Sequence, residues 1–244
     1  AALSAVGPFS IDAYLPSMGQ ISHTLGASPF AVQLTLTAYM GSFALMTLWH
    51  GAISDAVGRR RVVLWGLALF ALASAACALA RSIEALLVFR ALQGMTAGTG
   101  VVVGRAIVRD RFHGADAQRV MAQITLTFAL APAIAPVLGG WLQVWFGWRA
   151  IFVFLVLFSG GMGLLCHRLL PETLPPAHRR SLHPASLLRS YREVLTSPPF
   201  LAVCLALSLT FSGGGVVGMS APCFLMQRLH VSGTGSLWVC GSGT

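Results

Sequence analysis

Long apolar runs separated by short polar turns make up most of the chain. The clearest runs, residues 62–80 and 120–148, contain no charged side chain. An apolar stretch of about 20 residues is long enough to cross a bilayer as a helix. We therefore predict an all-α polytopic membrane protein, with spans at about residues 1–17, 30–54, 62–80, 85–107, 117–142, 150–170 and 199–226.

A polar segment rich in proline and arginine interrupts this pattern after the sixth predicted span. It divides the chain into a six-helix transmembrane bundle (1–170), a cytoplasmic linker (171–198) and helix 7 with the truncated start of a second bundle (199–244). Two bundles joined by a polar linker are typical of transporters built from two parallel halves. We therefore interpret the sequence as part of a longer protein.

Composition and charge support a membrane location. Of all residues, 56% are hydrophobic and 9% are charged, against about 25% charged in soluble proteins. The net charge of +9 does not indicate nucleic-acid binding, because most arginines lie in or beside alternate interhelical loops. This distribution follows the positive-inside rule. It predicts that the loops holding Arg59 and Arg109, the linker and the amino end of the first helix are cytoplasmic.

Cysteine and histidine spacing gives no indication of a metal or cofactor. The cysteines are scattered one per apolar segment without a C-x-x-C pair, so we expect neither a disulfide framework nor a zinc site. His23 and His50 lie near predicted span ends and have no partners at metal-ligand spacing. We expect both to be solvated. The cysteines are Cys77, Cys166, Cys204, Cys223 and Cys240.

Asp12 and Arg90 are the ionisable residues placed inside predicted spans. A charge at a helix centre costs at least about 2.5 to 3.5 kcal/mol, so such residues are commonly functional. Both lie about 7 to 9 Å below the same membrane surface at 1.5 Å per residue. One hypothesis is that Arg90 holds Asp12 ionised in a shared cavity until a proton or cationic ligand competes. The alternative is a static ion pair, or side chains that extend to the interface.

Further polar and small residues lie in the predicted spans beside Asp12 and Arg90 or in other predicted spans. Gln93 lies one turn after Arg90 on nearly the same helix face, and Tyr14 and Tyr39 either line a cavity or pack in the core. The span 117–142 contains prolines and a row of small residues at helical spacing, which permits close helix packing or a hinge. That segment contains Ala131, Pro132, Ala135, Pro136, Gly139 and Gly140.

A charged turn, GAISDAVGRRR, lies between the second and third predicted spans at residues 51–61. Its arginines and Asp55 require water at a bilayer surface, whereas Gly51 and Gly58 suit close packing and a sharp reversal. The turn resembles the loop 2–3 signature of the major facilitator superfamily, with alanine at position 56 in place of a basic residue. The matching residues are Gly51, Asp55, Gly58, Arg59 and Arg60.

Other segments resemble a smaller group of transporters within this superfamily. Asp12 to Pro16 (DAYLP) is similar to helix 1 of drug:proton antiporters, and residues 86–98, with Arg90 and Gln93, are similar to their helix 4 motif. Residues 135–140 resemble the helix 5 antiporter motif, with alanine at 135. The segments 105–110, 147–149 and 171–173 resemble the Bcr/CflA branch of bicyclomycin and chloramphenicol efflux proteins, with threonine at position 47 in place of the usual glutamine.

The resemblance implies a twelve-helix, two-half transporter, not an enzyme. It would export small drug-like compounds in exchange for protons, as a monomer without cofactors in the bacterial inner membrane. Asp12, Tyr14, Arg90 and Gln93 would take part in proton coupling and substrate response, the turn in a cytoplasmic gate, and Pro136, Gly139 and Gly140 in a helix contact. The alternatives are a metabolite transporter of the same superfamily and a truncated, non-transporting membrane fragment.

Overall fold

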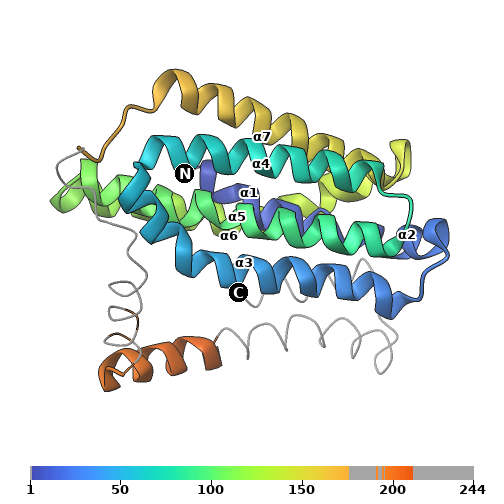
Figure 1. Ribbon diagram of the computed structural model, residues 1–244, viewed down its shortest axis with the longest axis horizontal. Helices are drawn as coiled ribbons and strands as arrows, with labels where there is room; N and C mark the ends of the chain where they lie inside the picture. The colour runs from blue at the N-terminus through green and yellow to red at the C-terminus, as the bar shows by residue number, and fades with distance from the viewer. Residues whose placement is uncertain (1, 176–190, 192–193, 195, 211–244) are drawn as a thin grey trace. The chain divides into compact units, whose positions relative to one another are not determined.

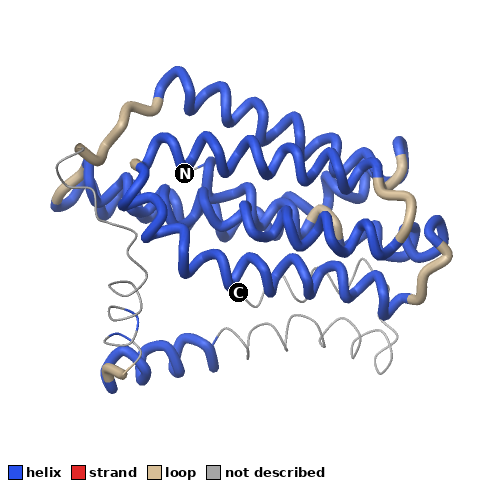
Figure 2. Tube along the Cα trace, viewed as in Figure 1, coloured by secondary structure: helices blue, strands red, loops and turns tan. Residues whose placement is uncertain are grey.

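The computed structural model describes residues 2–175, 191, 194 and 196–210, all within helices or loops (Figure 2). Two compact units divide the chain, Ala1–Leu182 and His183–Thr244, and each is considered by itself. The second unit contains an apolar helix at Pro198–Thr210. In the first unit the elements follow the order α1 (Ala2–Asp12), η1 (Leu15–Ser17), α2 (Met18–Leu25), α3 (Pro29–Val57), α4 (Arg59–Leu79), α5 (Ile83–Arg111), α6 (Gly114–Phe146) and α7 (Arg149–Leu169).

Helices α3 to α7 run alongside one another in the first unit (Figure 1). All five are long and apolar enough to cross a membrane, which confirms the all-α membrane fold class. They lie where the spans between residues 30 and 170 were predicted. Three are longer than predicted by four residues or more, with 29 residues in α3, 29 in α5 and 33 in α6, because polar residues such as Asp55 and Arg109 extend the helices past their apolar centres.

The prediction of one continuous helix over residues 1–17 is wrong. Helix α1 ends at Asp12, a 3-10 turn follows at Leu15–Ser17, and α2 continues to Leu25. Pro16 has no backbone N–H to donate to Asp12, so the helical ladder is broken there. The amides of Tyr14 and Ser17 instead bond three residues back, at 3.2 and 3.0 Å, as in a 3-10 helix. Of the predicted span 199–226, residues 211–226 lie outside the described part.

Helix α5 is the most buried of the spans because glycines bring its backbone against two neighbours. A Cβ added at Gly94 would lie 2.2 Å from the carbonyl oxygen of Tyr39 on α3, and one at Gly100 would lie 2.2 Å from that of Leu3 on α1. A side chain at either position would force the helices apart. Small residues thus permit the contact, as in many membrane bundles.

The row of small residues on α6 packs in the same way against the end of α1. Ala131, Ala135 and Gly139 are buried, and a Cβ at Gly139 would lie 2.2 Å from the carbonyl oxygen of Ala13. The structure therefore places this row in a close helix contact. A hinge role for the same row stays a prediction.

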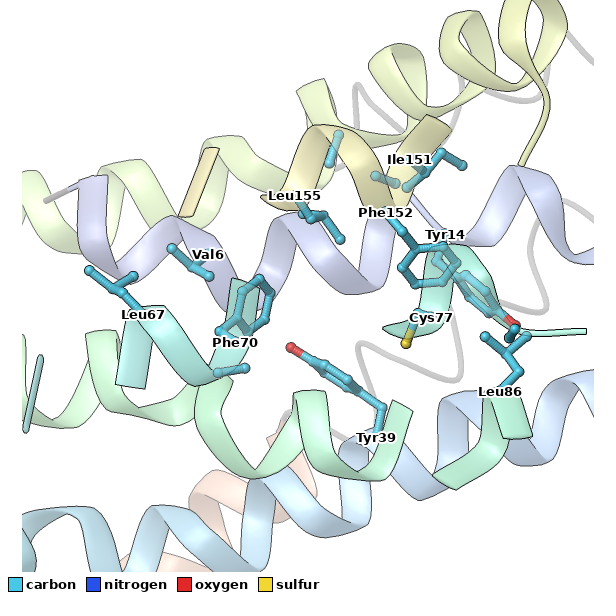
Figure 3. Packing of buried hydrophobic residues seen from close by; sticks show 14 of the residues in the cluster. Val6, Tyr14, Tyr39, Leu67, Phe70, Cys77, Leu86, Ile151, Phe152 and Leu155 are labelled. Atoms are coloured by element: carbon cyan, nitrogen blue, oxygen red, sulfur yellow. The ribbon is translucent and has the colours of Figure 1, made fainter. Parts of the chain in front are cut away.

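An apolar core fills the space between α1, α4, α5 and α7. Figure 3 shows Val6, Leu67, Phe70, Phe152 and Leu155 converging there, with Tyr14 and Tyr39 beside them. Many large apolar side chains on the outer faces of the helices are exposed instead. Such exposure is expected where hydrocarbon, and not water, surrounds a helix.

Candidate functional site

Arg90 on α5 is buried in the bundle, with none of its surface exposed. Its guanidinium carbon lies 4.5 Å from the centroid of the Tyr14 ring and 4.3 Å from that of the Tyr39 ring. The Phe152 ring is 6.0 Å away. Aromatic faces attract a cation, and the attraction is strongest when the cation is desolvated. The aromatic side chains therefore replace part of the hydration that Arg90 loses.

Hydrogen bonds fix the Arg90 side chain on one side. Its Nη1 donates to Gln93 Oε1 at 2.7 Å and to the carbonyl oxygen of Ser10 at 3.3 Å. Gln93 Nε2 in turn donates to Ser74 Oγ at 2.7 Å. Arg90 and Gln93, one turn apart on α5, thus form a connected buried pair whose orientation depends on α1 and α4.

The two tyrosine hydroxyls are held by small polar residues. Ser10 Oγ donates to the Tyr39 hydroxyl, which donates to the carbonyl oxygen of Gly7 at 3.3 Å. The Tyr14 hydroxyl lies 2.7 Å from Thr35 Oγ1. Ser10, Thr35 and Ser74 were not predicted from the sequence, because isolated serines and threonines in apolar runs have no distinctive spacing. Only the contacts identify them as supports of the Arg90 site.

Asp12 and Arg90 do not form an ion pair in this conformation. Both ion pairs among the described residues belong to Arg59, and Arg90 Nε and Nη2 have no hydrogen-bond partner. Asp12, the last residue of α1, is half-buried. The alternative of a static ion pair is therefore not met, because tyrosine rings and Gln93 surround the guanidinium, whereas the shared cavity stays a prediction.

A second polar site lies at the end of the bundle where α3 meets α4. Gly58 joins the two helices with a φ of +112°, a conformation that favours glycine. Arg59 then pairs with Asp55 one turn earlier and with Asp110 Oδ2 on α5 through its Nε at 3.0 Å. Its Nη1 also donates to Ser54 Oγ. This largely buried arginine links three helix ends.

Glu172 completes this charged end from the segment that follows α7. Its Oε1 accepts the backbone N–H of Arg59 at 2.9 Å and those of Thr173 and Leu174 at 3.1 and 3.2 Å. Gly58 precedes Arg59 and has no side chain, so Glu172 acts as the cap at the amino end of α4, where a negative charge is favoured. We call Asp55, Arg59, Asp110 and Glu172 the gate cluster, after the gate role that the sequence motif around Arg59 predicts.

Other predicted site residues have weaker structural roles. Arg60 Nη2 donates to the carbonyl oxygen of His167 at 2.6 Å, which joins α4 to α7. Gly51 is not tightly packed, since a Cβ there would lie 3.9 Å from the nearest atom, on Val102. Pro136 is half-buried, and a Cβ at Gly140 would have no atom within 4 Å.

The expectation that His50 is solvated is wrong. Its side chain is 4% exposed, because α3 continues beyond it to Val57 and packs along α5. His23, in contrast, is exposed on α2. The sequence indicated where the apolar run ends but not how far the helix extends past that point.

Comparisons with known sequences agree with the fold. The sequence model of the Major Facilitator Superfamily matches residues 1–244. The chain is 35% identical to the uncharacterized MFS-type transporter YdgK of Bacillus subtilis, over 93% of this chain and 57% of that protein. It is 31% identical to multidrug resistance protein D of Escherichia coli, over 90% and 53%. It is 33% identical to the bicyclomycin resistance protein homolog of Haemophilus influenzae, over 86% and 53%.

A solved structure shows the same fold. The human organic anion transporter MFSD10 superposes with a TM-score of 0.63 and 22% identity, over 95% of this chain and 65% of that one. The chain spans little more than half the length of the curated relatives described above. The relatives and this neighbour are transporters or resistance proteins, not enzymes. The chain therefore belongs to the Major Facilitator Superfamily, with named relatives among its drug-resistance members.

Proposed function

We propose that the protein containing this chain exports small drug-like compounds across the bacterial inner membrane in exchange for protons. Transport would follow alternating access by two bundles, the first formed by residues 1–170 and joined by a linker at 171–198 to a second that begins at 199. The names of the relatives support the substrate class. The positive-inside distribution of arginines supports a cytoplasmic amino end. The protein would act as a monomer in the bilayer, without a cofactor.

The observation that carries this proposal is a buried cation on α5 and a half-buried carboxylate at the end of α1 that are not bound to each other. The buried positive charge of Arg90 is stabilised in part by contacts with Tyr14, Tyr39 and Gln93. Asp12 has no hydrogen bond or ion pair within the described part of the chain. Its carboxylate is therefore available to bind a proton or a cationic group of the substrate. Both cannot neutralise the same carboxylate at once, so their competition would couple the two fluxes.

The energetics allow this exchange. Moving one elementary charge across 100 mV supplies about 2.3 kcal/mol, which corresponds to roughly a fortyfold concentration ratio of an uncharged substrate, at about 1.4 kcal/mol per factor of ten. Tyr14 and Gln93, which touch Arg90, would transmit the protonation state of Asp12 to the cavity wall.

The gate cluster would stabilise the outward-open state at the cytoplasmic face. Arg59 already holds the ends of α3 and α5 together through Asp55 and Asp110. The turn residues Gly51, Gly58 and Arg60 would support this arrangement, and the segment Pro136 to Gly140 on α6 would shape the helix contact that changes during transport. Opening the cytoplasmic side would require these ion pairs to separate or to move together.

A resistance panel tests the proposed function. A bacterial strain that lacks its own efflux pumps would express either the complete gene, the complete gene with Asp12→Asn, or residues 1–244 alone. We expect raised resistance to several amphipathic drugs with the complete gene only. Raised resistance to none of them would contradict drug export and favour a metabolite transporter. Failure of the complete gene product to insert into the membrane would instead favour a non-transporting fragment.

A further inference from the structure

A cavity separate from the Arg90 site opens between α3, α4 and α5. Its volume is about 260 Å³, and its lining includes Met46, His50, Ile53, Trp65, Leu69 and Met95. None of these residues contacts Arg90 or belongs to the gate cluster. The accessible surface inside the cavity is almost entirely apolar. We call it the α3–α5 pocket.

One wall of the α3–α5 pocket contains a polar group with incomplete bonding. His50 is 4% exposed, and its Nδ1 has no hydrogen-bond partner. Buried polar atoms normally find a partner when helices pack completely. Gly98 on α5 gives His50 its space, since a Cβ there would lie 3.3 Å from Nδ1. His50 therefore places one polar side chain in an otherwise apolar wall.

The pocket opens onto an apolar stripe of α4. Trp65, Leu69, Leu72 and Leu79 are 69%, 53%, 67% and 76% exposed, and their spacing places them on one helix face. The opposite side of α4 packs on α5 and α7. In a membrane-spanning helix, such a face is in contact with lipid chains. The pocket is therefore a recess in a lipid-facing surface.

A free positive charge lies at the charged end of this same stripe. Arg61 precedes Trp65 by one helical turn, so the two side chains share the α4 face. Arg61 is exposed and, within the described part of the chain, makes no hydrogen bond or ion pair, whereas Arg59 and Arg60 both do. The stripe thus combines a cation at the membrane surface with an apolar recess below it.

We propose that the α3–α5 pocket binds one acyl chain of an anionic phospholipid, with the lipid phosphate paired to Arg61. The protein offers a complementary surface to the acyl chain and to the phosphate of this lipid. The acyl chain meets the side chains of Met46, Trp65 and Met95, and the phosphate meets a guanidinium, which suits phosphate geometry. A zwitterionic lipid would fill the recess equally well but would gain less from Arg61. The pocket therefore selects for headgroup charge.

Trp65 supplies the measurement, because bromine on an acyl chain quenches tryptophan fluorescence on contact. The full-length protein, with tryptophan retained at position 65 and replaced by phenylalanine elsewhere in the sequence, would be reconstituted in nanodiscs of unlabelled phosphatidylcholine. Brominated phosphatidylglycerol or brominated phosphatidylcholine would then be added at equal mole fractions. We expect phosphatidylglycerol to half-saturate the quenching at a mole fraction about fivefold lower, since one surface arginine favours an anionic lipid by about that factor.

Three variants distinguish the parts of the proposal. Arg61→Gln should abolish the preference, whereas Arg119→Gln, an exposed arginine on α6 outside the pocket, should retain it. Thr96→Phe, which fills the pocket from α5, should weaken quenching by both lipids without changing the Trp65 emission in unlabelled nanodiscs. Equal quenching by the two lipids, or a preference that survives Arg61→Gln, would overturn the proposal. Absence of quenching by either lipid would mean that another part of the protein fills the pocket, and would also overturn it.

Discussion

The Arg90 guanidinium carbon lies 4.3 Å from the centroid of the Tyr39 ring. Tyr39 on α3 thereby stabilises the positive charge of Arg90 on α5, which is fully buried. The Tyr39 hydroxyl is tied in turn to Ser10 and Gly7 of α1. The Tyr39 side chain therefore connects three helices, α1, α3 and α5.

Replacing Tyr39 should separate the contribution of the ring from that of the hydroxyl. Tyr39→Phe keeps the aromatic face and should cost about 1 kcal/mol of stability for the lost hydrogen bonds. Tyr39→Leu removes the face as well and should cost about 2 kcal/mol more, because the buried cation loses its aromatic partner. Thermal unfolding in detergent measures both. Equal destabilisation by the two variants would contradict the cation–π contact.

Adjacent glycines on α6 provide a matched pair of substitutions. A Cβ at Gly139 would lie 2.2 Å from the Ala13 carbonyl oxygen, whereas a Cβ at Gly140 would have no atom within 4 Å. Gly139→Ala should therefore destabilise the bundle by about 1 to 3 kcal/mol through overpacking. Gly140→Ala should leave the unfolding temperature unchanged or slightly raised. A result in which Gly140→Ala is the more harmful would show that α6 and α1 do not pack as described.

Glu172 should control local opening at the start of α4. Loss of a helix cap costs about 1 kcal/mol, which corresponds to about fivefold faster amide exchange where exchange follows local opening. Hydrogen exchange of the Arg59 amide in Glu172→Ala measures this directly. Glu84→Ala, in the first turn of α5, serves as the control. An Arg59 amide equally protected in both variants would refute the cap.

The apolar pattern predicted the helices between residues 30 and 170 because membrane spans must satisfy their backbone internally. It could not predict the break after Asp12. A proline near a span end indicates where a helix ends, but not that a 3-10 turn follows. The turn at Leu15 to Ser17 depends on local backbone hydrogen bonds. Sequence motifs selected Arg90 and Arg59, whose charges are conspicuous in this composition.

The partners of these arginines were harder to predict. Depth along the helices placed Asp12 and Arg90 at one level, but depth does not specify rotation about the helix axis. Tyr14 and Tyr39 consequently occupy the space that an ion pair would need. The burial of His50 could not be predicted for a related reason, because burial near a helix end depends on a neighbouring helix that is distant in sequence.

Proton release driven by substrate is the sharpest test of whether Asp12 couples proton movement to drug export. The full-length protein in proteoliposomes would be given a transported drug at weak buffering, and the external pH would be followed with wild type, Asp12→Asn and the control Glu84→Gln, an exposed carboxyl at the start of α5. Proton coupling through Asp12 predicts drug-driven proton movement for wild type and Glu84→Gln, and none for Asp12→Asn even when that variant still binds the drug. Unchanged proton movement in Asp12→Asn would contradict it.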